Sequence, residues 1–309
     1  MDDRTSSEIL EVKDLSIYFE SNYQTVKAVD QVSFSLKRGE ILGIVGESGS
    51  GKSTLAYAVL NMIPKPKGRL AGGEIIYKGI NLLECKEIDS IRGRNISIIL
   101  QNAMSVLDPV FTIGNQLIEN IRIKSSVSKK EAGKRALEIL SLLEFDSPEL
   151  IMKSYPYELS GGMRQRILIG LAIANHPDII IADEPTTALD VMVQKKIIHL
   201  LKKIVSELHI SLLLITHNFG LVWEICDRAV VMQNGRVVES AEVTEIYDHP
   251  IHPYTRGLLK AIPTFESDPS KPLPTVEEEM NGNRCLTGEY AEIKAGHYVL
   301  NEKETENHA

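Results

Sequence analysis

Short runs of alternating apolar and polar residues open the chain. Residues 9–45 contain three such runs, which predict strands with one buried face, and the polar stretch 37–40 predicts a turn. Beyond Gly51 the apolar positions recur at helical spacing until the proline-rich run 64–68 ends the pattern. The chain is therefore expected to begin with strands and to enter a helix directly after a glycine-rich turn.

Strands and helices then alternate over the next 200 or so positions. Three continuous apolar runs, typical of strands buried on both faces, lie at 95–101, 178–184 and 209–217. Residues 227–240 predict a hairpin that turns at Asn234-Gly235.

Two stretches have helical periodicity, 110–176 and 191–208. In the first, Ala136, Leu137, Leu140 and Leu143 fall on one face of a helix. Strands that alternate with helices predict an α/β fold, in which helices cover the faces of a parallel sheet. Beyond residue 262 the chain becomes proline-rich and acidic, so residues 263–309 are predicted to form a loosely ordered C-terminal extension.

Composition and charge narrow the functional classes. The formal net charge of −8 gives no electrostatic footprint for nucleic acid. No apolar run is long enough to span a bilayer, and the acidic start lacks the apolar core of a signal peptide. Cys85, Cys226 and Cys285 lie far apart, which predicts neither a disulfide framework nor a zinc site. These features favour a reduced, cytoplasmic setting, with any membrane role exerted through a partner.

A glycine-rich turn after the third predicted strand carries the strongest chemical signal. It matches the pattern G-x-x-x-x-G-K-[ST] between a strand and a helix, which is the context that phosphate binding requires. Its backbone N–H groups, the lysine ammonium and the serine hydroxyl suit a nucleotide phosphate with Mg²⁺. The predicted nucleotide-binding residues are Gly46, Glu47, Ser48, Gly49, Ser50, Gly51, Lys52, Ser53 and Thr54, with Ser53 also a metal ligand. A chance glycine-rich turn is the alternative, and it is rare in this context.

Polar residues at the ends of the apolar strands are the candidate catalytic groups. Asp183 suits Mg²⁺, and Glu184 is placed to take a proton from an attacking water. Gln101 is a candidate for the metal or the water, and His217 for holding the γ-phosphate. Each of these residues alone is more often a solvated strand end or a structural side chain, and the glycine-rich turn is what favours the catalytic interpretation.

Two further features have open alternatives. Tyr18 or Phe19 is a candidate for stacking on adenine, but a strand aromatic in a core is equally consistent with the sequence. Ser160, Gly161 and Gly162 precede a predicted helix and offer a second anion site, although Ser160 is also a good helix cap.

Taken in order along the chain, these motifs resemble the nucleotide-binding subunit of an ABC transporter. The motifs are the glycine-rich turn, the strand-end Gln101, "LSGGMRQ", "ADEP", "TTALD" and the strand-end His217, and the resemblance covers about residues 9–262. It implies an α/β fold with a P-loop NTPase core of ABC type, an antiparallel β subdomain and a C-terminal extension. It also implies one ATPase domain over residues 1–262, with a helical subdomain at about 103–176.

The resemblance further implies partners. Two ATPase subunits would pack head to tail, so that Ser160, Gly161 and Gly162 of one complete the ATP site of the other. Gln165 and Asp190 join the predicted nucleotide-binding set, with Asp190 communicating between the two sites, and Gln101 faces the membrane subunits. The expected cofactors are ATP and Mg²⁺.

A narrower resemblance is to the peptide and nickel uptake branch, through "DPVFTIGNQ", "SYPYELSGGMRQR" and "HPIHPYTRGLLKAIP", and in particular to the first of its two paired ATPases. It implies import of oligopeptides, dipeptides, nickel or metallophores, powered from the cytoplasmic face of the membrane by a peripheral subunit. The implied partners are a second, different ATPase, two integral membrane permeases and an extracellular or periplasmic binding protein, with no nucleic acid.

The chain departs from this branch at two points. It has "QNA" at Gln101, which leaves the contacts with the membrane subunits open, and only Cys285 remains of a cysteine cluster. No iron–sulfur centre is therefore expected, because one thiolate cannot replace four ligands. A soluble ABC-type ATPase acting on DNA or ribosomes is the alternative. A P-loop kinase or GTPase would leave "LSGGMRQ" unexplained.

Overall fold

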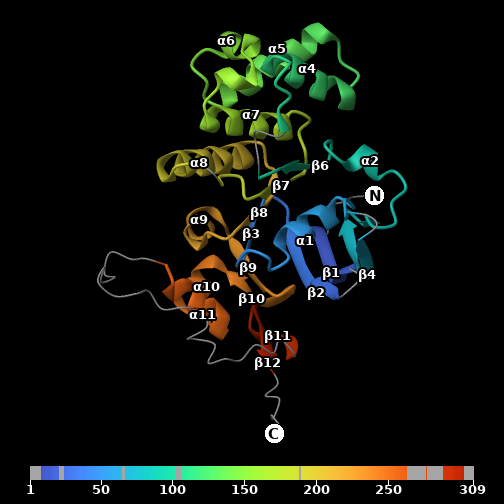
Figure 1. The fold of residues 1–309 in the computed structure, drawn as a ribbon, viewed down its shortest axis with the longest axis vertical. Coiled ribbons are helices and arrows are strands. Elements are labelled where there is room, and N and C mark those ends of the chain that lie inside the picture. Colours follow the sequence, from blue (N-terminus) through green and yellow to red (C-terminus); the bar gives the residue numbers. More distant parts are fainter. Residues whose placement is uncertain are drawn as a thin grey trace. The chain divides into compact units, whose positions relative to one another are not determined.

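The fold is seen in a computed structural model, which describes residues 8–20, 24–64, 67–101, 106–187, 189–262, 276 and 288–302 (Figure 1). The "QNA" departure beyond Gln101 and Cys285 lie outside these residues. The chain divides into two compact units. Unit 1 comprises residues 1–36, 41–84 and 215–309, and unit 2 comprises residues 37–40 and 85–214.

Unit 1 contains an antiparallel sheet built from the first predicted strands. Its order is β2-β1-β4-β5, and β1 pairs with β4 from Leu10 opposite Tyr77 to Phe19 opposite Gly68. A register shift between Lys13 and Ser16 bends β1. The strands are β1 Glu8–Glu20, β2 Thr25–Lys37, β4 Gly68–Tyr77 and β5 Ile80–Asn81. This sheet is the antiparallel β subdomain that the family resemblance implies.

A second group of strands in unit 1 joins the glycine-rich turn to the C-terminal part of the chain. Its order is β11-β12-β10-β9-β3, with β3 and β9 parallel. Strands β9 and β10 form the predicted hairpin, and Asn234 and Gly235 both have positive φ (46° and 82°), as a type I′ turn requires. The strands are β3 Ile41–Val45, β9 Arg228–Gln233, β10 Arg236–Glu242, β11 Gly288–Lys294 and β12 His297–Glu302.

Strands β11 and β12 correct the prediction for the C-terminal extension. Residues 288–302 form a hairpin that turns at Gly296, with Val299 and Leu300 buried. Strand β12 pairs with β10 at Glu239 and Ser240. The alternation in this segment is a strand signal of ordinary strength, and the acidic, proline-rich residues before it obscured it. At least this part of the extension is therefore ordered.

A hydrophobic core in unit 1 ties the C-terminal part of the chain to β3. Val45, Phe219, Val231 and Leu300 all belong to it, together with Tyr254, whose side chain has no exposed surface. The helices of this unit are α1 Lys52–Val59, α9 Phe219–Ile225, α10 Val243–Asp248 and α11 Pro253–Lys260. Helix α11 thus shares a core with β3, the strand that leads into the glycine-rich turn.

His252 caps helix α11 from inside this core. Its Nδ1 accepts a hydrogen bond from the Tyr254 N–H (3.2 Å), and its side chain is almost fully buried. Burial lowers the pKa of His252 from 6.5 to about 4, because the charged form loses its hydration. The imidazole is therefore neutral in the folded chain at physiological pH.

This buried imidazole predicts a pH-dependent stability. Between pH 6.5 and about 4 the unfolded chain binds a proton at His252 that the folded chain does not, so the free energy of unfolding falls as the pH is lowered through this range. The loss is roughly 3 kcal/mol, at about 1.4 kcal/mol per pH unit. Asparagine also caps helices but does not titrate, so the free energy of unfolding of His252→Asn is expected to depend less on pH. Denaturant unfolding at pH 4.5 and 7.5 measures the effect, and equal pH slopes in the two proteins would contradict it.

Unit 2 contains parallel strands and most of the helices. Strands β8, β7 and β6 are neighbours in that order, and β6 pairs with β7 from Ile96 opposite Ile179 to Ile99 opposite Ala182. Strand β8 runs on across the boundary into unit 1. The strands are β6 Ile96–Ile99, β7 Ile179–Asp183 and β8 Ser211–Thr216, and all three predicted buried strands are confirmed.

Side chains at their N-termini cap several helices of unit 2, among them Ser160, for which the sequence left a capping role open. Thr112, Ser128, Ser160 and Asp190 each accept a hydrogen bond from a backbone N–H in the first turn of the helix that follows. Ala136 and Leu140 are buried on one face of α5. The helices are α2 Ile88–Ile91, α4 Ile113–Lys124, α5 Lys129–Leu142, α6 Pro148–Lys153, the 3₁₀ helix η1 Pro156–Glu158, α7 Gly161–Ile173 and α8 Val191–Glu207. The helices from α4 to α7 lie within the predicted helical subdomain.

No helix in the described part of the chain is both long and apolar enough to cross a membrane.

Candidate functional site

The glycine-rich turn, residues 46–54, joins the fully buried strand β3 to helix α1. A Cβ at Gly46 would lie 2.1 Å from the Met232 carbonyl oxygen, and one at Gly51 would lie 2.0 Å from the Ala28 carbonyl oxygen. Only glycine fits at these two positions, and Gly51 also has φ of 101°. The turn of the β9–β10 hairpin holds the loop as well, because the Gly235 N–H donates to the Ser50 carbonyl (3.0 Å).

Lys52 places its ammonium inside this loop. The side chain is 5% exposed, and Nζ donates to the carbonyl oxygens of Gly46 (2.8 Å) and Glu47 (2.7 Å) and to Ser50 Oγ (3.3 Å). Gly51 at the N-cap of α1 provides no side-chain cap, and the first turn contains no acidic residue. A buried ammonium beside the positive end of a helix fits a phosphate anion.

The strand-end residues of unit 2 form a hydrogen-bonded group around Glu184. One carboxylate oxygen, Oε2, accepts from Gln101 Nε2 (2.8 Å) and from Thr187 Oγ1 (2.9 Å). Gln101 follows β6 and Glu184 follows β7, and these parallel neighbours end at the same edge. Glu184 also has φ of 47°, which is a strained backbone conformation for a residue with a side chain. Two predicted catalytic residues are therefore in direct contact.

Sequence reasoning missed Thr187. It lies in the turn after β7, and its N–H donates to the Glu184 carbonyl (3.2 Å), which brings its hydroxyl back to the carboxylate. The available signal was its spacing of three residues from Glu184, which is typical of a hydrogen-bonded turn.

The residues predicted to bind a metal offer oxygen donors. Asp183 ends β7 with 3% of its surface exposed, and Ser53 lies exposed in the first turn of α1. Carboxylate and hydroxyl oxygens are the donors that Mg²⁺ prefers, so these residues fit that ion. Among the residues that the structure describes, no three His, Cys, Asp or Glu side chains gather into a metal centre.

The predicted second anion site lies where the N-termini of α7 and α8 meet. Ser160 is exposed and caps α7, with Oγ accepting from the Met163 N–H (3.3 Å). A Cβ at Gly162 would lie 2.8 Å from a methyl carbon of Val193 in α8, so the glycine permits close packing of the two helices. Asp190 caps α8 through the Val193 N–H (3.0 Å). Two capped helix N-termini therefore lie side by side within unit 2.

Gln165 differs from the other predicted residues of this motif. Its side chain is 3% exposed, and its Nε2 has no hydrogen-bond partner within the described part of the chain. Ser160 and Gly161, by contrast, are exposed. Within "LSGGMRQ", Ser160 and Gly161 are therefore exposed, whereas Gln165 is buried.

The remaining predicted residues lie in unit 1. His217 is exposed directly after β8, where Asn218 caps helix α9. Tyr18 and Phe19 are half-buried in β1, and the Tyr18 hydroxyl donates to Asp30 Oδ1 (3.0 Å). Stacking of either aromatic residue on adenine stays a prediction.

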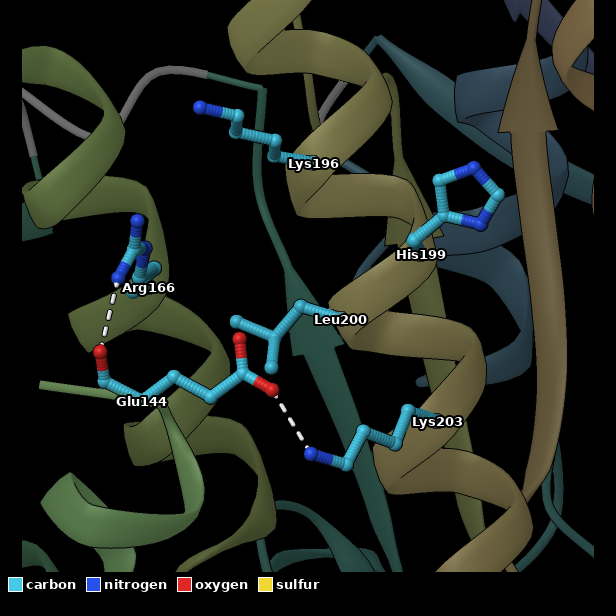
Figure 2. A pocket seen from close by; sticks show the side chains of 6 residues that line it. All are labelled: Glu144, Arg166, Lys196, His199, Leu200 and Lys203. Carbon is cyan, nitrogen blue, oxygen red and sulfur yellow. Dashed lines mark hydrogen bonds and ion pairs between the residues drawn. The ribbon is translucent and has the colours of Figure 1, made fainter.

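A pocket of about 280 Å³ in unit 2 is distinct from these groups (Figure 2). Its lining consists of Glu144, Arg166, Lys196, His199, Leu200 and Lys203. Figure 2 shows Glu144 between helices α7 and α8, where its carboxylate meets Lys203 Nζ (2.7 Å) and its carbonyl meets Arg166 (3.3 Å). The Lys203 ammonium lowers the pKa of Glu144. None of the predicted site residues lines this pocket.

Together the two units contain the parts of a P-loop ATPase of the ABC type. Residues 29–187 match the family described as "ABC transporter", and residues 238–286 match "Oligopeptide/dipeptide transporter, C-terminal region". The chain therefore belongs to the ABC transporter family, which confirms the predicted family and fold class.

Named relatives support this membership. The probable peptide ABC transporter ATP-binding protein y4tR of Sinorhizobium fredii is 43% identical over 270 residues, covering 87% of this chain and 81% of the relative. The oligopeptide transport ATP-binding protein OppD of Bacillus subtilis is 44% identical over 270 residues, with coverage of 87% and 75%. Among solved structures, the ATP-binding cassette MJ0796, a dimer in a post-hydrolysis state bound to ADP and Pi, has a TM-score of 0.67. It is 29% identical and covers 76% of this chain and 98% of its own.

Proposed function

We propose that this chain is the ATP-hydrolysing subunit that powers an importer of oligopeptides or dipeptides. The observation that carries the ATPase role is the buried Lys52 ammonium inside a loop where only glycine fits. The match of residues 238–286 to the C-terminal region of oligopeptide and dipeptide transporters favours peptides over nickel or metallophores as the transported class. The names of the relatives given above favour peptides as well.

In this proposal, residues 46–54 bind the nucleotide phosphates. Lys52 exchanges its loop carbonyl partners for phosphate oxygens, and the N–H groups at the start of α1 add hydrogen bonds. Ser53 and Asp183 hold Mg²⁺, which neutralises charge on the phosphates when it is bound. Tyr18 or Phe19 supports the adenine.

Glu184 acts as the general base toward the attacking water. The hydrogen bonds from Gln101 and Thr187 fix the orientation of its carboxylate before the nucleotide binds. His217 holds the γ-phosphate in line with this base.

A second ATPase subunit completes each site in this proposal. The exposed Ser160 and Gly161 face the nucleotide held by the partner, Gln165 supports their helix from within, and Asp190 links the two sites. The partner is a different ATPase, and the pair works at the cytoplasmic face of the membrane with two permease subunits. A binding protein outside the membrane delivers the peptide.

Replacing Lys52 tests the phosphate-binding role. Lys52→Ala removes a charge that would contact the phosphates, and it is expected to weaken ATP binding by about 10- to 100-fold, since hydrogen bonds to charged groups contribute about 1.5–3 kcal/mol. Equilibrium titration with Mg-ATP measures the change. Lys153→Ala, at an exposed position of α6, is the matched control and should bind normally. Unchanged affinity in Lys52→Ala would rule out the proposed role of this loop.

A further inference from the structure

Tyr254, in the C-terminal region of the chain, reaches the glycine-rich turn directly. Its side chain has no exposed surface. Its hydroxyl accepts a hydrogen bond from the backbone N–H of Glu47 (3.1 Å) and donates one to Glu47 Oε2 (3.3 Å). Burial raises the pKa of this hydroxyl, so it stays protonated and can fill both roles across the physiological pH range.

The residue that Tyr254 holds is also a partner of the phosphate-binding lysine. The Glu47 carbonyl oxygen accepts from Lys52 Nζ at 2.7 Å. The N–H that Tyr254 engages lies in the same planar peptide group as the Gly46 carbonyl, which also accepts from Lys52 Nζ (2.8 Å), so fixing this N–H fixes the direction of that carbonyl. A continuous path of hydrogen bonds therefore runs from Tyr254 through Glu47 to Lys52.

Tyr254 is in turn held by buried groups from three C-terminal elements. The backbone N–H of Tyr254 donates to Nδ1 of His252. The backbone N–H of His252 donates to Oε2 of Glu239 in β10 (3.1 Å). Glu239 has no exposed surface, and its other carboxylate oxygen lies 2.7 Å from Nε2 of His297 in β12. The orientation of Tyr254 thus depends on β10, on the start of α11 and on the C-terminal hairpin.

We propose that Tyr254 is a positioning residue for nucleotide binding, through which the C-terminal region sets the affinity of this chain for ATP. Its hydroxyl holds Glu47, and with it the loop around Lys52, in the conformation that receives phosphates. This inference rests on the proposed phosphate-binding role of residues 46–54. Preorganisation of a loop raises affinity because binding no longer has to order it.

The test replaces only the hydroxyl. Tyr254→Phe in the full chain is expected to weaken Mg-ATP binding by roughly 3- to 10-fold, the loss that corresponds to one neutral hydrogen bond. In steady-state assays the KM for ATP should rise by the same factor while kcat stays within about 2-fold, because the effect is on binding. Equilibrium titration and a KM-against-kcat comparison give the two readouts.

Tyr290→Phe is the matched control. Tyr290 lies in β11, is half-buried and is hydrogen-bonded to Ser240, so this change also removes one tyrosine hydroxyl from the C-terminal region. It should leave ATP affinity unchanged. Thermal unfolding of both variants shows whether stability alone changes.

The possible outcomes distinguish failure of the Tyr254 positioning role from failure of the phosphate-binding role of residues 46–54. Weaker ATP binding in Tyr254→Phe but not in Tyr290→Phe supports a positioning role. If Lys52→Ala weakens binding and Tyr254→Phe does not, the positioning role is overturned while the phosphate site stands. Equal losses in both tyrosine variants, matched by equal losses of stability, also overturn it. Normal binding in Lys52→Ala would remove the proposed phosphate site and the inference together.

Discussion

Glu184→Gln is expected to slow ATP hydrolysis by at least ~100-fold while leaving ATP binding intact, because it removes the general base but keeps the size of the side chain. The glutamine carbonyl oxygen can still accept the hydrogen bonds from Gln101 and Thr187, so the local geometry should persist. Phosphate release at saturating Mg-ATP measures the rate, and nucleotide titration measures the affinity. The closed, ATP-bound dimer should accumulate, since hydrolysis is the step that opens it.

An exposed glutamate provides the control for this prediction. Glu138→Gln in α5 makes the same chemical change away from β7 and should hydrolyse ATP at the normal rate. Near-normal hydrolysis in Glu184→Gln would place the base elsewhere, and His217→Ala would then be the next variant to measure.

A bulky cation at Ser160 should abolish hydrolysis without affecting nucleotide binding by the chain that carries it. If the exposed N-terminus of α7 completes the site of a partner, Ser160→Arg obstructs the closed interface. Turnover should then fall in both sites of the assembled complex, because closure is one shared event. ATP affinity of the isolated chain and ATPase rate of the complex are the paired measurements.

The competing explanation is that Ser160 only caps α7. In that case Ser160→Ala would cost about 1 kcal/mol of stability and the arginine variant would still hydrolyse ATP once folded. Ser128→Arg is the matched control, because Ser128 is also exposed and caps α5 through the Glu131 N–H (3.2 Å). Loss of turnover in Ser160→Arg alone supports a shared site, whereas equal behaviour of the two variants contradicts it.

Local patterns account for what could be predicted from the sequence. The β9–β10 turn at Asn234-Gly235 and the buried face of α5 each depend on a few neighbouring residues, as does the glycine-rich turn. Such features are determined by backbone sterics and periodicity, which a single sequence contains.

Contacts between distant residues could not be predicted in the same way. Gln101 and Glu184 are 83 positions apart, so each was a candidate alone while their hydrogen bond depended on which strands are neighbours. The Glu47–Tyr254 contact spans 207 positions and has no local signal at all.

The β9–β10 turn also bears on how this chain can be engineered. Hairpin tips usually tolerate inserted tags or reporter domains, because their backbone faces solvent. Here the Gly235 N–H donates to Ser50 in the glycine-rich turn, and the Gly235 carbonyl accepts from the Asp30 N–H (2.8 Å). An insertion between Asn234 and Gly235 would break both attachments and disturb residues 46–54. A fusion partner is therefore better placed away from this turn.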